Sequence, residues 1–419
     1  MPSGADPTPH RSRAPVNPVF APSFEANIPR FFIVRALTNF MLFLPIWVIY
    51  VQARHGIDLV EVTLLDSAFW LTMALTEVPT GAVADTAGRK TSYALGVGIS
   101  AGAVLLFGLA TTYPLVLVAN SLWAFGLTFV SGADMAFFYD TLRELGRTDE
   151  YPKFRGWIAV TDVAATGVSG AVGGVLLGWF PTAPFTVYAG LLALAFVIIL
   201  TFKEPPRERD ADTGLHLTYW QTLGVTYKAV REQHHLRRVL AYSNLLPVAA
   251  SVIGVTLIQP YAVRMGLPVA LLGIIILGVN VVRVAGSSSA GRLSARLGER
   301  RLLALAPWVM TAGVVGLGLW NAWPGLVIYP LAAFSVSATR PAIEAIILRE
   351  TPGSVRATIL SVDSLVFRLL LAAFSPLAGW LGEAYSLSAA FVILGIGTAA
   401  GLVWVLWGWG PIAPGTELR

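Results

Sequence analysis

Cysteine is absent from this sequence, and charged residues are scarce. Without cysteine the chain can form neither disulfide bonds nor thiolate metal sites. Only 13% of the 419 residues are charged, against roughly 25% in a soluble domain, and 55% are hydrophobic. Each membrane-crossing helix needs about 20 apolar residues. The composition therefore favours a chain that crosses a membrane many times.

Histidine is missing from the apolar parts of the chain. The five histidines lie in the N-terminal tail or in polar connections: His10, His55, His216, His234 and His235. This placement argues against a histidine metal site inside a membrane, and no set of nucleophile, base and orienting group is apparent. A phosphate-binding loop is not visible either, because six residues separate Gly81 from Gly88 and Arg89 precedes Lys90. We expect a protein that is not an enzyme and needs no cofactor.

Basic residues give the chain a net charge of +5, but they are spread along it and are not massed in one segment. A membrane surface explains this spread better than nucleic acid does. The N-terminal "MPSGADPTPHRSRAPVNP" has no short apolar core with a cleavage site, so it is read as a tail and not as a signal peptide.

Apolar segments of membrane-spanning length recur through the rest of the chain. Twelve can be marked: 28–53, 60–84, 91–112, 114–141, 154–180, 182–202, 237–263, 268–296, 301–321, 323–348, 355–381 and 385–409. They predict an all-α integral membrane protein with twelve transmembrane helices.

One long connection divides these segments into two groups of six. The expected organisation is a disordered cytosolic tail (1–27), a six-helix bundle (28–202), a cytosolic linker (203–236), a second six-helix bundle (237–409) and a cytosolic tail (410–419). Within the linker, "YWQTLGVTYKAVREQ" has apolar residues at helical spacing. It is compatible with a helix on the membrane surface or with an ordinary solvated helix.

Lysine and arginine are distributed unevenly among the connections. Arg54 and Arg264 lie in connections assigned to the outside, four arginines lie inside apolar segments, and the others lie in the tails, in alternate connections or beside them. Because lysine and arginine are retained on the cytosolic side, we expect both termini to be cytosolic in the cell (inner) membrane.

The two groups of six resemble each other in sequence. A shift of about 210 residues superposes Gly81 on Gly291, Gly88 on Gly298 and Lys90 on Arg300, and a shift of 206 superposes Arg143-Glu144 on Arg349-Glu350. These matches indicate two parallel six-helix halves. Such duplications are typical of secondary transporters, whose substrate site lies between the halves.

The stretch "GAVADTAGRK" carries a family resemblance. It resembles the loop between the second and third helices of the major facilitator superfamily, Gly-x-x-x-Asp-x-x-Gly-Arg-Lys/Arg, and comprises Gly81, Asp85, Gly88, Arg89 and Lys90. The stretches "EVPTG", "SGADMAFFYDTL" and "RATILS" are similar to a bacterial branch close to drug/proton antiporters. Two features depart from that branch: "SGAVGG" in the fifth segment lacks the usual proline, and the fourth segment lacks an arginine.

The resemblance implies a mechanism as well as a fold. It implies a major facilitator fold that works by alternating access, with the signature loop as part of a cytosolic gate. For Asp85 it implies a role in holding the halves together on the cytosolic side, with Arg143 or Arg356 as partners. The missing proline leaves the direction of transport open.

Charged residues inside the apolar segments are candidates for function, because each costs roughly 2.5–3.5 kcal/mol on insertion scales. Nine stand out: Arg35, Glu77, Asp134, Asp162, Arg283, Arg340, Glu344, Asp363 and Arg368. Six of them lie at one depth, about seven or eight residues from the cytosolic ends. This layer predicts ion pairs that form and break during transport, such as Asp134 with Arg340 and Arg35 with Glu77. The alternative is that static pairs only fix helix packing.

A carboxylate in this layer can also carry a coupling proton. Burial favours the protonated form of a carboxylate, whereas a neighbouring arginine favours the charged form. Breaking and re-forming such a pair would therefore bind and release a proton. Asp134 is the first candidate, followed by Glu77 and Asp162.

Candidate substrate-binding residues come from two groups. Arg283 and Arg368, with Asn280, can bind an anionic group, although Arg368 can instead pair with Asp363 or Glu344. Trp47, Trp70 and Trp123 lie too deep for interfacial anchors. They can line an aromatic cavity for an amphipathic molecule, although lipid-facing packing is the alternative. The residues predicted beside them in this cavity are Asn39, Phe40 and Gln259. The full set of candidates is Arg35, Asn39, Phe40, Trp47, Gln259, Asn280, Arg283, Arg340, Glu344, Asp363 and Arg368.

The leading hypothesis is a monomeric, proton-coupled exporter of amphipathic organic compounds. Its partners are a small-molecule substrate, protons and the lipid bilayer. Uptake or exchange of an organic anion and lipid flipping are alternatives within transport. A sensor built on a transporter scaffold is the alternative from another class, and the complete signature loop argues against it.

Overall fold

The computed structural model describes residues 22–206, 234–320, 322–351 and 356–407. Most of the predicted N-terminal tail and most of the linker lie outside these ranges, as do the C-terminal tail and the whole of "YWQTLGVTYKAVREQ". Within them all regular structure is helical, as predicted.

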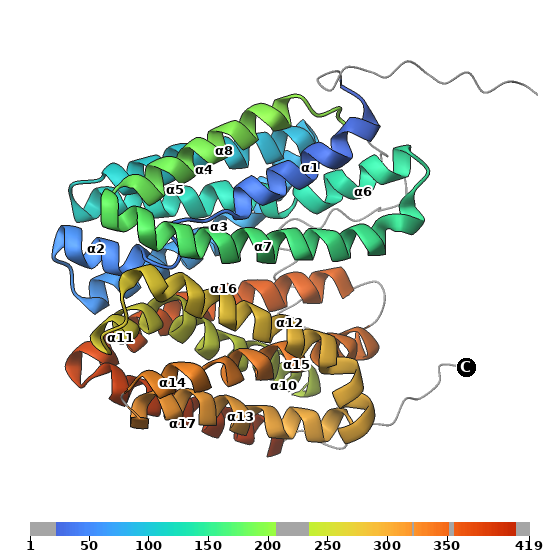
Figure 1. Cartoon of the computed structure of the whole chain (residues 1–419). Helices are drawn as coiled ribbons and strands as arrows, with labels where there is room; N and C mark the ends of the chain where they lie inside the picture. Colours follow the sequence, from blue (N-terminus) through green and yellow to red (C-terminus); the bar gives the residue numbers. More distant parts are fainter. Residues whose placement is uncertain (1–21, 207–233, 321, 352–355, 408–419) are drawn as a thin grey trace, which may run out of the picture.

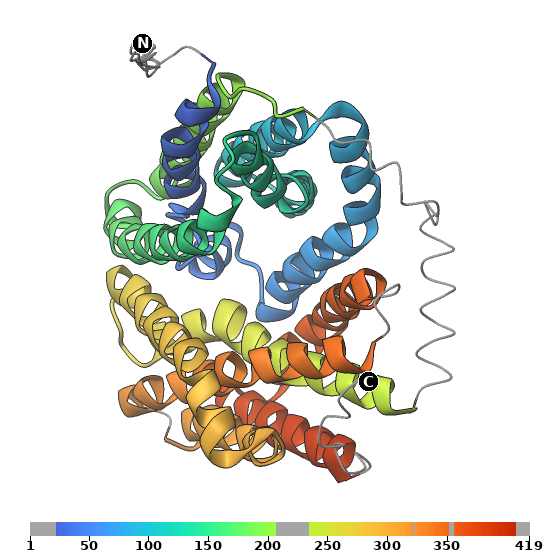
Figure 2. The ribbon, with the colours of Figure 1, turned by 90° about the vertical axis from the view of Figure 1, so that its right-hand side faces the viewer.

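The helices form two halves, which Figure 1 shows as an upper and a lower layer. The N half contains α1 (Phe24–Asn39), α2 (Trp47–His55), α3 (Leu59–Ala87), α4 (Arg89–Leu109), α5 (Tyr113–Ser131), α6 (Asp134–Glu144), η1 (Thr148–Glu150), α7 (Tyr151–Trp179) and α8 (Ala183–Leu200). The C half contains α10 (His234–Ser251), η2 (Val252–Leu257, a π-helix), α11 (Ile258–Arg264), η3 (Val269–Leu271), α12 (Leu272–Leu297), α13 (Glu299–Trp320), α14 (Trp323–Ile328), α15 (Pro330–Glu350), α16 (Arg356–Ala384) and α17 (Leu387–Trp407). Seen end-on in Figure 2, the two halves are separate groups of helices.

Among the described residues, eleven helical spans are long and apolar enough to cross a membrane. They correspond to eleven of the twelve predicted segments. The remaining segment, 28–53, is divided between α1 and α2, which residues 40–46 separate. Pro45 lies in this interruption and has no backbone N–H to continue a helix. Neither piece is long enough alone, so the interruption accounts for the difference.

Interruptions recur at matching places in the two halves. The first and fourth segments of the N half break between α1 and α2 and between α5 and α6. Their counterparts in the C half break at η2, between α10 and α11, and at Tyr329, between α14 and α15. Irregular backbone at membrane depth is tolerated only where it is buried in protein or lines a cavity. The four interrupted segments therefore mark the interior of the molecule.

The internal repeat is visible in backbone geometry. Gly88 has φ 109° and its N–H donates to the carbonyl of Ala84, while Gly298 has φ 79° and its N–H donates to the carbonyl of Ser294. Both glycines end one helix just before the next begins. Because a positive φ is strained for other residues, the glycines matched by the 210-residue shift perform the same turn.

A second equivalent pair of interactions lies near the C-terminal ends of α4 and α13, the helices that begin after these two glycines. The Tyr50 hydroxyl donates to the carbonyl of Gly108 over 2.6 Å, and the Tyr261 hydroxyl donates to the carbonyl of Leu317 over 2.6 Å. Each tyrosine is buried, so its hydroxyl needs a partner. The two halves thus share internal contacts as well as sequence.

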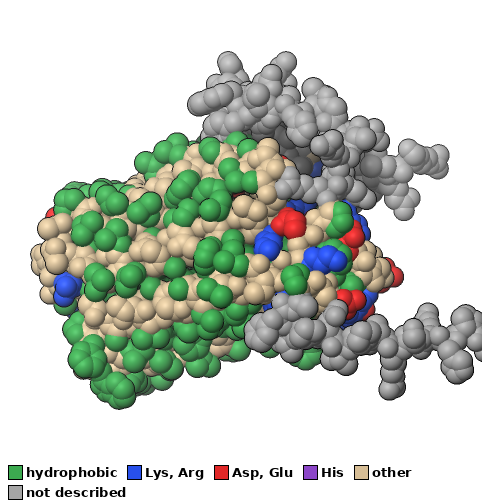
Figure 3. All heavy atoms as spheres, turned by 90° about the horizontal axis from the view of Figure 1, so that it is seen from above, with side chains coloured by type: hydrophobic (Ala, Val, Ile, Leu, Met, Phe, Trp, Pro, Cys, Tyr) green, Lys and Arg blue, Asp and Glu red, His purple; other side chains and the backbone are tan. Residues whose placement is uncertain are grey.

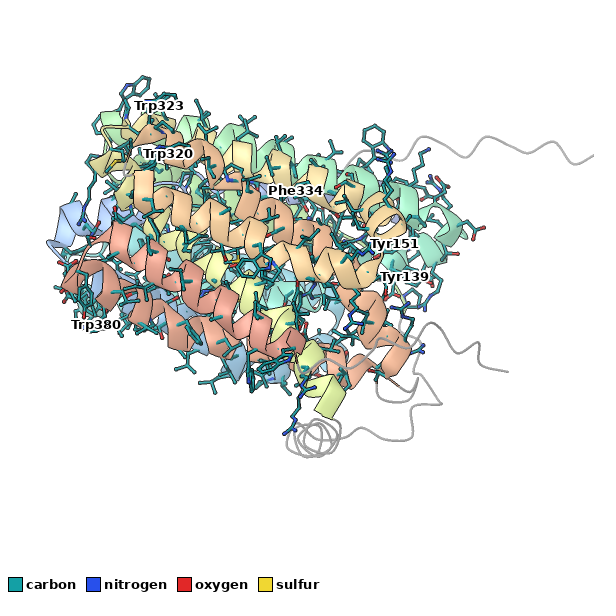
Figure 4. The ribbon with its side chains drawn as sticks, turned by 90° about the horizontal axis from the view of Figure 1, so that it is seen from below. Tyr139, Tyr151, Trp320, Trp323, Phe334 and Trp380 are labelled. Atoms are coloured by element: carbon teal, nitrogen blue, oxygen red, sulfur yellow. The ribbon has the colours of Figure 1, made fainter. Side chains whose placement is uncertain are left out.

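The surface separates apolar flanks from one charged end. In Figure 3 hydrophobic side chains cover the flanks and most of the charged side chains lie at one end. We call this the basic end; it holds the turns after α3, α6, α12 and α15. Figure 4 places Trp320, Trp323 and Trp380 at the other end, which we call the opposite end, and Tyr139 and Tyr151 near the basic end. Exposed aromatic residues at both ends are typical of membrane interfaces.

Candidate functional site

The two halves meet most closely at the opposite end, where α3 packs along α16. The Ser67 hydroxyl donates to the carbonyl of Ala372 over 2.5 Å, and the Ser375 hydroxyl donates to the Asp66 carboxylate over 2.5 Å. One turn further out, a Cβ on Gly379 would overlap the side chain of Thr63. Small and hydroxyl-bearing residues therefore let these helices approach closely.

Glycines make the second contact between the halves, where α7 packs against α12. Gly170 and Gly273 lie backbone to backbone, so a Cβ on Gly273 would overlap the backbone of Gly170. A Cβ on Gly174 would lie 2.5 Å from Cα of Ala270. The sequence "SGAVGG", which retains the glycines of the antiporter element without its proline, is thus a packing surface for the other half.

An ion pair between Glu77 on α3 and Arg368 on α16 joins the halves nearer the middle. Gln259 makes another link, because its side-chain amide donates to the carbonyl of Leu44 and its oxygen accepts from the N–H of Val48. The hydrogen bonds and ion pairs between described residues of the two halves all lie between the opposite end and the level of Glu77. As far as the described residues go, this conformation is therefore joined toward the opposite end and shows no such link at the basic end.

A charged cluster lies inside the N half, and we call it the Arg35 cluster. Arg35 on α1 donates to Asp134 over 2.7 Å and, through two nitrogens, to Asp162 on α7 over 3.1 and 2.5 Å. The Asn39 amide also donates to Asp162 over 3.0 Å. Two carboxylates thus share one guanidinium, which gives the cluster a formal charge of −1 when both are ionised.

Asp134 occupies a special backbone position in this cluster. Helix α5 ends at Ser131, and Asp134 is the first residue of α6. Its carboxylate accepts the N–H of Met135 over 2.6 Å. The start of a helix favours negative charge because free N–H groups point outward there. The break in this segment therefore helps to hold the Asp134 carboxylate beside Arg35.

The C half contains its own polar cluster. Asp363 on α16 accepts hydrogen bonds from the Ser243 hydroxyl and, over 2.8 Å, from the Asn244 amide, both on α10. Arg340 on α15 lies 3.5 Å from Asp363 and 2.6 Å from Glu344. Asp363 is buried, whereas Arg340 and Glu344 are partly exposed, so this cluster is open on one side.

The observed ion pairs differ from those predicted by depth. Asp134 pairs with Arg35 and not with Arg340, and Glu77 pairs with Arg368 and not with Arg35. Arg368 accordingly contacts neither Asp363 nor Glu344 in the part of the chain that is described. Two residues at the same depth in the membrane can be far apart in the plane of the membrane. Arg35 and Asp134 belong to the same half, so they can stay paired whether or not the two halves approach each other.

A cavity lined by aromatic side chains lies inside the molecule, and we call it the aromatic cavity. It has a volume of about 190 Å³ and lies between α2, α3, α5 and η2. Trp47, Trp70 and Trp123 all line it. The three residues predicted beside them do not: Asn39 is bonded to Asp162, Phe40 packs on the core of the N half, and Gln259 lines a second cavity.

A second cavity, which we call the arginine cavity, lies between the halves and has a volume of about 230 Å³. Its lining includes the predicted residues Gln259, Asn280 and Arg283, together with Thr166 and Tyr329. Leu44 and Val255 line both cavities. The two predicted groups of substrate-binding residues thus occupy adjacent spaces.

Sequence reasoning overlooked Asp66, a buried carboxylate that lines the aromatic cavity. Asp66 lies outside the layer of charges near the basic end, on which the prediction concentrated. A signal was available, because Trp70 follows it by four residues and so lies on the same helix face. In the structure the indole N–H of Trp70 donates to Asp66 over 3.1 Å.

Comparison with known proteins settles the family. A profile of the Major Facilitator Superfamily matches residues 31–279, more than half of the chain. The chain belongs to the Major Facilitator Superfamily. It is therefore a membrane transporter and not an enzyme. No curated protein matches the sequence.

Solved structures of other transporters share the fold. The nucleoside transporter NupG has a TM-score of 0.72 at 14% identity, over 91% of this chain and 98% of that one. A bacterial homolog of the human lysosomal transporter Spinster has 0.69 at 16% identity (94% and 96%). A D-xylose-proton symporter has 0.67 at 14% identity (93% and 98%). These similarities establish the twelve-helix superfamily fold.

The superfamily signature loop is held within the N half in this conformation. Arg89 forms an ion pair with Asp140, which also lies 3.5 Å from Arg143, and the Lys90 ammonium donates to the carbonyl of Phe202 over 2.7 Å. Asp85 is exposed, and no cation among the described residues pairs with it. In the described part of the chain neither predicted partner pairs with it: Arg143, in the same half, lies beside Asp140, and Arg356, in the other half, donates to the carbonyl of Thr351.

Arg356 and Gly81 fit the same conformation. The side chain of Arg356 donates to the carbonyl of Thr351 over 3.1 Å, so it is turned toward its own half. A Cβ on Gly81 would meet nothing within 4 Å. In this conformation no described neighbour therefore requires a glycine at position 81. The clasp by Asp85 stays a prediction for the state in which the basic end closes.

Proposed function

We propose that this transporter couples proton movement to the export of amphipathic organic compounds by alternating access. In this proposal it lies in the cell (inner) membrane with the basic end and both termini in the cytosol, as the distribution of lysine and arginine supports. The hydrogen bonds and ion pairs that join the described parts of the two halves lie toward the opposite end. The conformation is accordingly the one open to the cytosol, from which an exporter loads its substrate.

The Arg35 cluster is the observation that carries the proposal of proton coupling. Among the described residues Arg35 is the one cation in direct contact with its two carboxylates, with Arg155 further from Asp134, so the cluster has a place for one proton. Asp162 holds Arg35 through two hydrogen bonds and also accepts from Asn39, whereas Asp134 receives one hydrogen bond from Arg35 and one from the N–H of Met135. Asp134 is therefore the carboxylate more easily released from the arginine, and we assign the proton to it.

Transport by the purified protein in proteoliposomes tests this function. With an imposed pH gradient and a panel of cationic, neutral and anionic compounds, we expect proton flux and accumulation of an amphipathic compound to occur together. Uptake that is insensitive to the gradient, with no proton flux for any compound that binds, would contradict the proposal.

Uptake or exchange of an organic anion is the second candidate function. It is favoured by Arg283, which lines a cavity with Asn280 and has no carboxylate partner among the described residues. In the same panel, gradient-dependent transport confined to anionic compounds would select it over export of amphipathic compounds.

The Glu77–Arg368 pair gives a prediction for alternating access. Reversing either charge places two like charges in contact between α3 and α16. Arg368 is buried and Glu77 is about one-third exposed, so the cost lies below the about 3–5 kcal/mol of breaking a fully buried pair. We expect Glu77→Arg and Arg368→Glu each to lower the transport rate at least about tenfold. The double variant should recover part of this loss, because it restores opposite charges.

The exposed pair of Glu299 and Arg349 serves as a matched control, because both residues lie in the C half and an exposed pair contributes little. Reversal of either of its charges should leave the transport rate nearly unchanged. A double variant of Glu77 and Arg368 that is no better than the single ones would show that the pair does not act as a unit.

A further inference from the structure

Asp66 is a buried anion without a counter-cation. Its residue is 7% exposed, and its two carboxylate oxygens accept hydrogen bonds from the Trp70 indole and the Ser375 hydroxyl. The indole N–H is a donor only, so the group it meets must be an acceptor. No lysine or arginine pairs with Asp66 within the described ranges. A buried carboxylate that lacks a cation is costly, and a cationic ligand would relieve that cost.

The walls of the aromatic cavity suit an organic cation. Phe69 lies 5.0 Å from Trp123 and 5.3 Å from Trp70 between ring centroids, and Phe43 lies 5.0 Å from Trp123. Trp47 completes this wall. Aromatic faces attract cations, and cages of such rings bind quaternary ammonium groups. With one carboxylate among them, these rings provide both attraction and apolar contact.

The arginine cavity has the reverse charge. Arg283 and Asn280 lie one helical turn apart on α12, and no acidic residue lines the cavity. The side-chain amide of Gln259 already donates to the carbonyls of Leu44 and Val255. Of the nitrogen-bearing side chains that line this cavity, Arg283 and Asn280 are therefore the ones available to donate to a ligand. A guanidinium presents parallel N–H groups that match a carboxylate or phosphate.

The two cavities adjoin, because Leu44 and Val255 line both. A ligand with one charge would satisfy Asp66 or Arg283 and leave the other without a partner. We propose that the two cavities together bind one zwitterionic organic molecule, with its cationic group among the rings at Asp66 and its anionic group at Arg283 and Asn280. This inference rests on the proposed transport of amphipathic compounds and names their charge pattern.

Equilibrium binding to the full chain in lipid nanodiscs, with no gradient, tests this site. The probes are trimethylammonio-alkanoates whose short spacers differ by one methylene, each compared with the alkyltrimethylammonium and the alkanoate of the same length. Binding is followed by calorimetry and by quenching of tryptophan fluorescence. At one spacer length we expect the zwitterion to bind at least about tenfold more tightly than either singly charged analogue.

Two variants separate the contributions of the two ends. Asp66→Asn should remove the advantage of the zwitterion over the alkanoate, and Arg283→Gln should remove its advantage over the alkyltrimethylammonium. Arg283 is exposed in its cavity, so that variant is suitable if Asp66→Asn does not fold. Glu61→Gln and Arg296→Gln, on the same two helices but outside both cavities, are the matched controls and should keep both advantages.

The outcomes distinguish this inference from the proposed function. Equal binding of zwitterion and single ions at every spacer length, or an advantage unchanged by Arg283→Gln, would overturn the zwitterion site. If zwitterions bind as expected but a pH gradient does not drive them in proteoliposomes, the site stands and the proton-coupled function fails. Gradient-driven transport of compounds without a zwitterion preference would give the reverse result.

Discussion

Replacing Asp134 by asparagine should abolish gradient-driven accumulation while substrate binding persists. Asparagine keeps the size of the side chain but cannot take up or release a proton. In the wild-type cluster the proton has a place because Asp134 and Asp162 share Arg35. In the variant Asp162 alone balances Arg35, the cluster is neutral, and no group is left to exchange a proton when the halves move.

The measurement is accumulation in proteoliposomes at an imposed difference of two pH units. Coupling to one proton supports a concentration ratio of up to about 100, because each pH unit corresponds to about tenfold. We expect the ratio to fall to about one for Asp134→Asn, with facilitated equilibration retained. Asp149→Asn, at an exposed position of the same half, is the control and should accumulate substrate normally. Undiminished accumulation in Asp134→Asn would exclude Asp134 as the proton carrier.

The architecture was predictable because it depends on local and periodic signals. The apolar segments, the signature loop and the 210-residue repeat each follow from residue type and spacing. Gly88 and Gly298 both have positive φ values. The matched glycines therefore end their helices in the same kind of turn, which other residues adopt only with strain. The first segment was the exception, since Pro45 divides it into α1 and α2.

The ion pairs were not predictable from depth alone. Sequence position placed Arg35, Asp134 and Asp162 at one level, and the structure brings these three together. It did not show that Glu77 meets Arg368 across the halves, because that contact depends on which end of the transporter is closed. Asp66 was missed for a related reason: its partner Ser375 belongs to the other half, about three hundred residues further along the chain.

Conformation also decides which parts of a gate are in contact. The signature loop is anchored to its own half through Arg89 and Lys90, while Asp85 points to no described partner. Gly170 of α7 and Gly273 of α12, by contrast, are in close backbone contact toward the opposite end. Among the described residues one gate is thus assembled and the other apart, which is the arrangement that the proposed alternating access needs in one of its states.

Replacing Gly273 by valine should shift the protein toward the state in which the opposite end is open. Gly273 lies against the backbone of Gly170, so a branched side chain cannot be accommodated without separating α7 from α12. Overpacking of a close contact typically costs about 1–3 kcal/mol. A penalty of that size, confined to one of two states, changes their ratio by about 5- to 150-fold.

Spin-label distances measure this shift directly, because the chain contains no cysteine that would need to be removed. Labels on Ala87→Cys and Arg300→Cys report the separation of the halves at the basic end, where both positions are exposed. Gly273→Val should replace the long distance of the present conformation by a shorter one and slow transport at least about tenfold. Gly278→Val is the matched control on the same helix, since a Cβ there would meet nothing within 4 Å. If both valine variants keep the same distance distribution as the wild type, the glycine contact does not control closure of the opposite end.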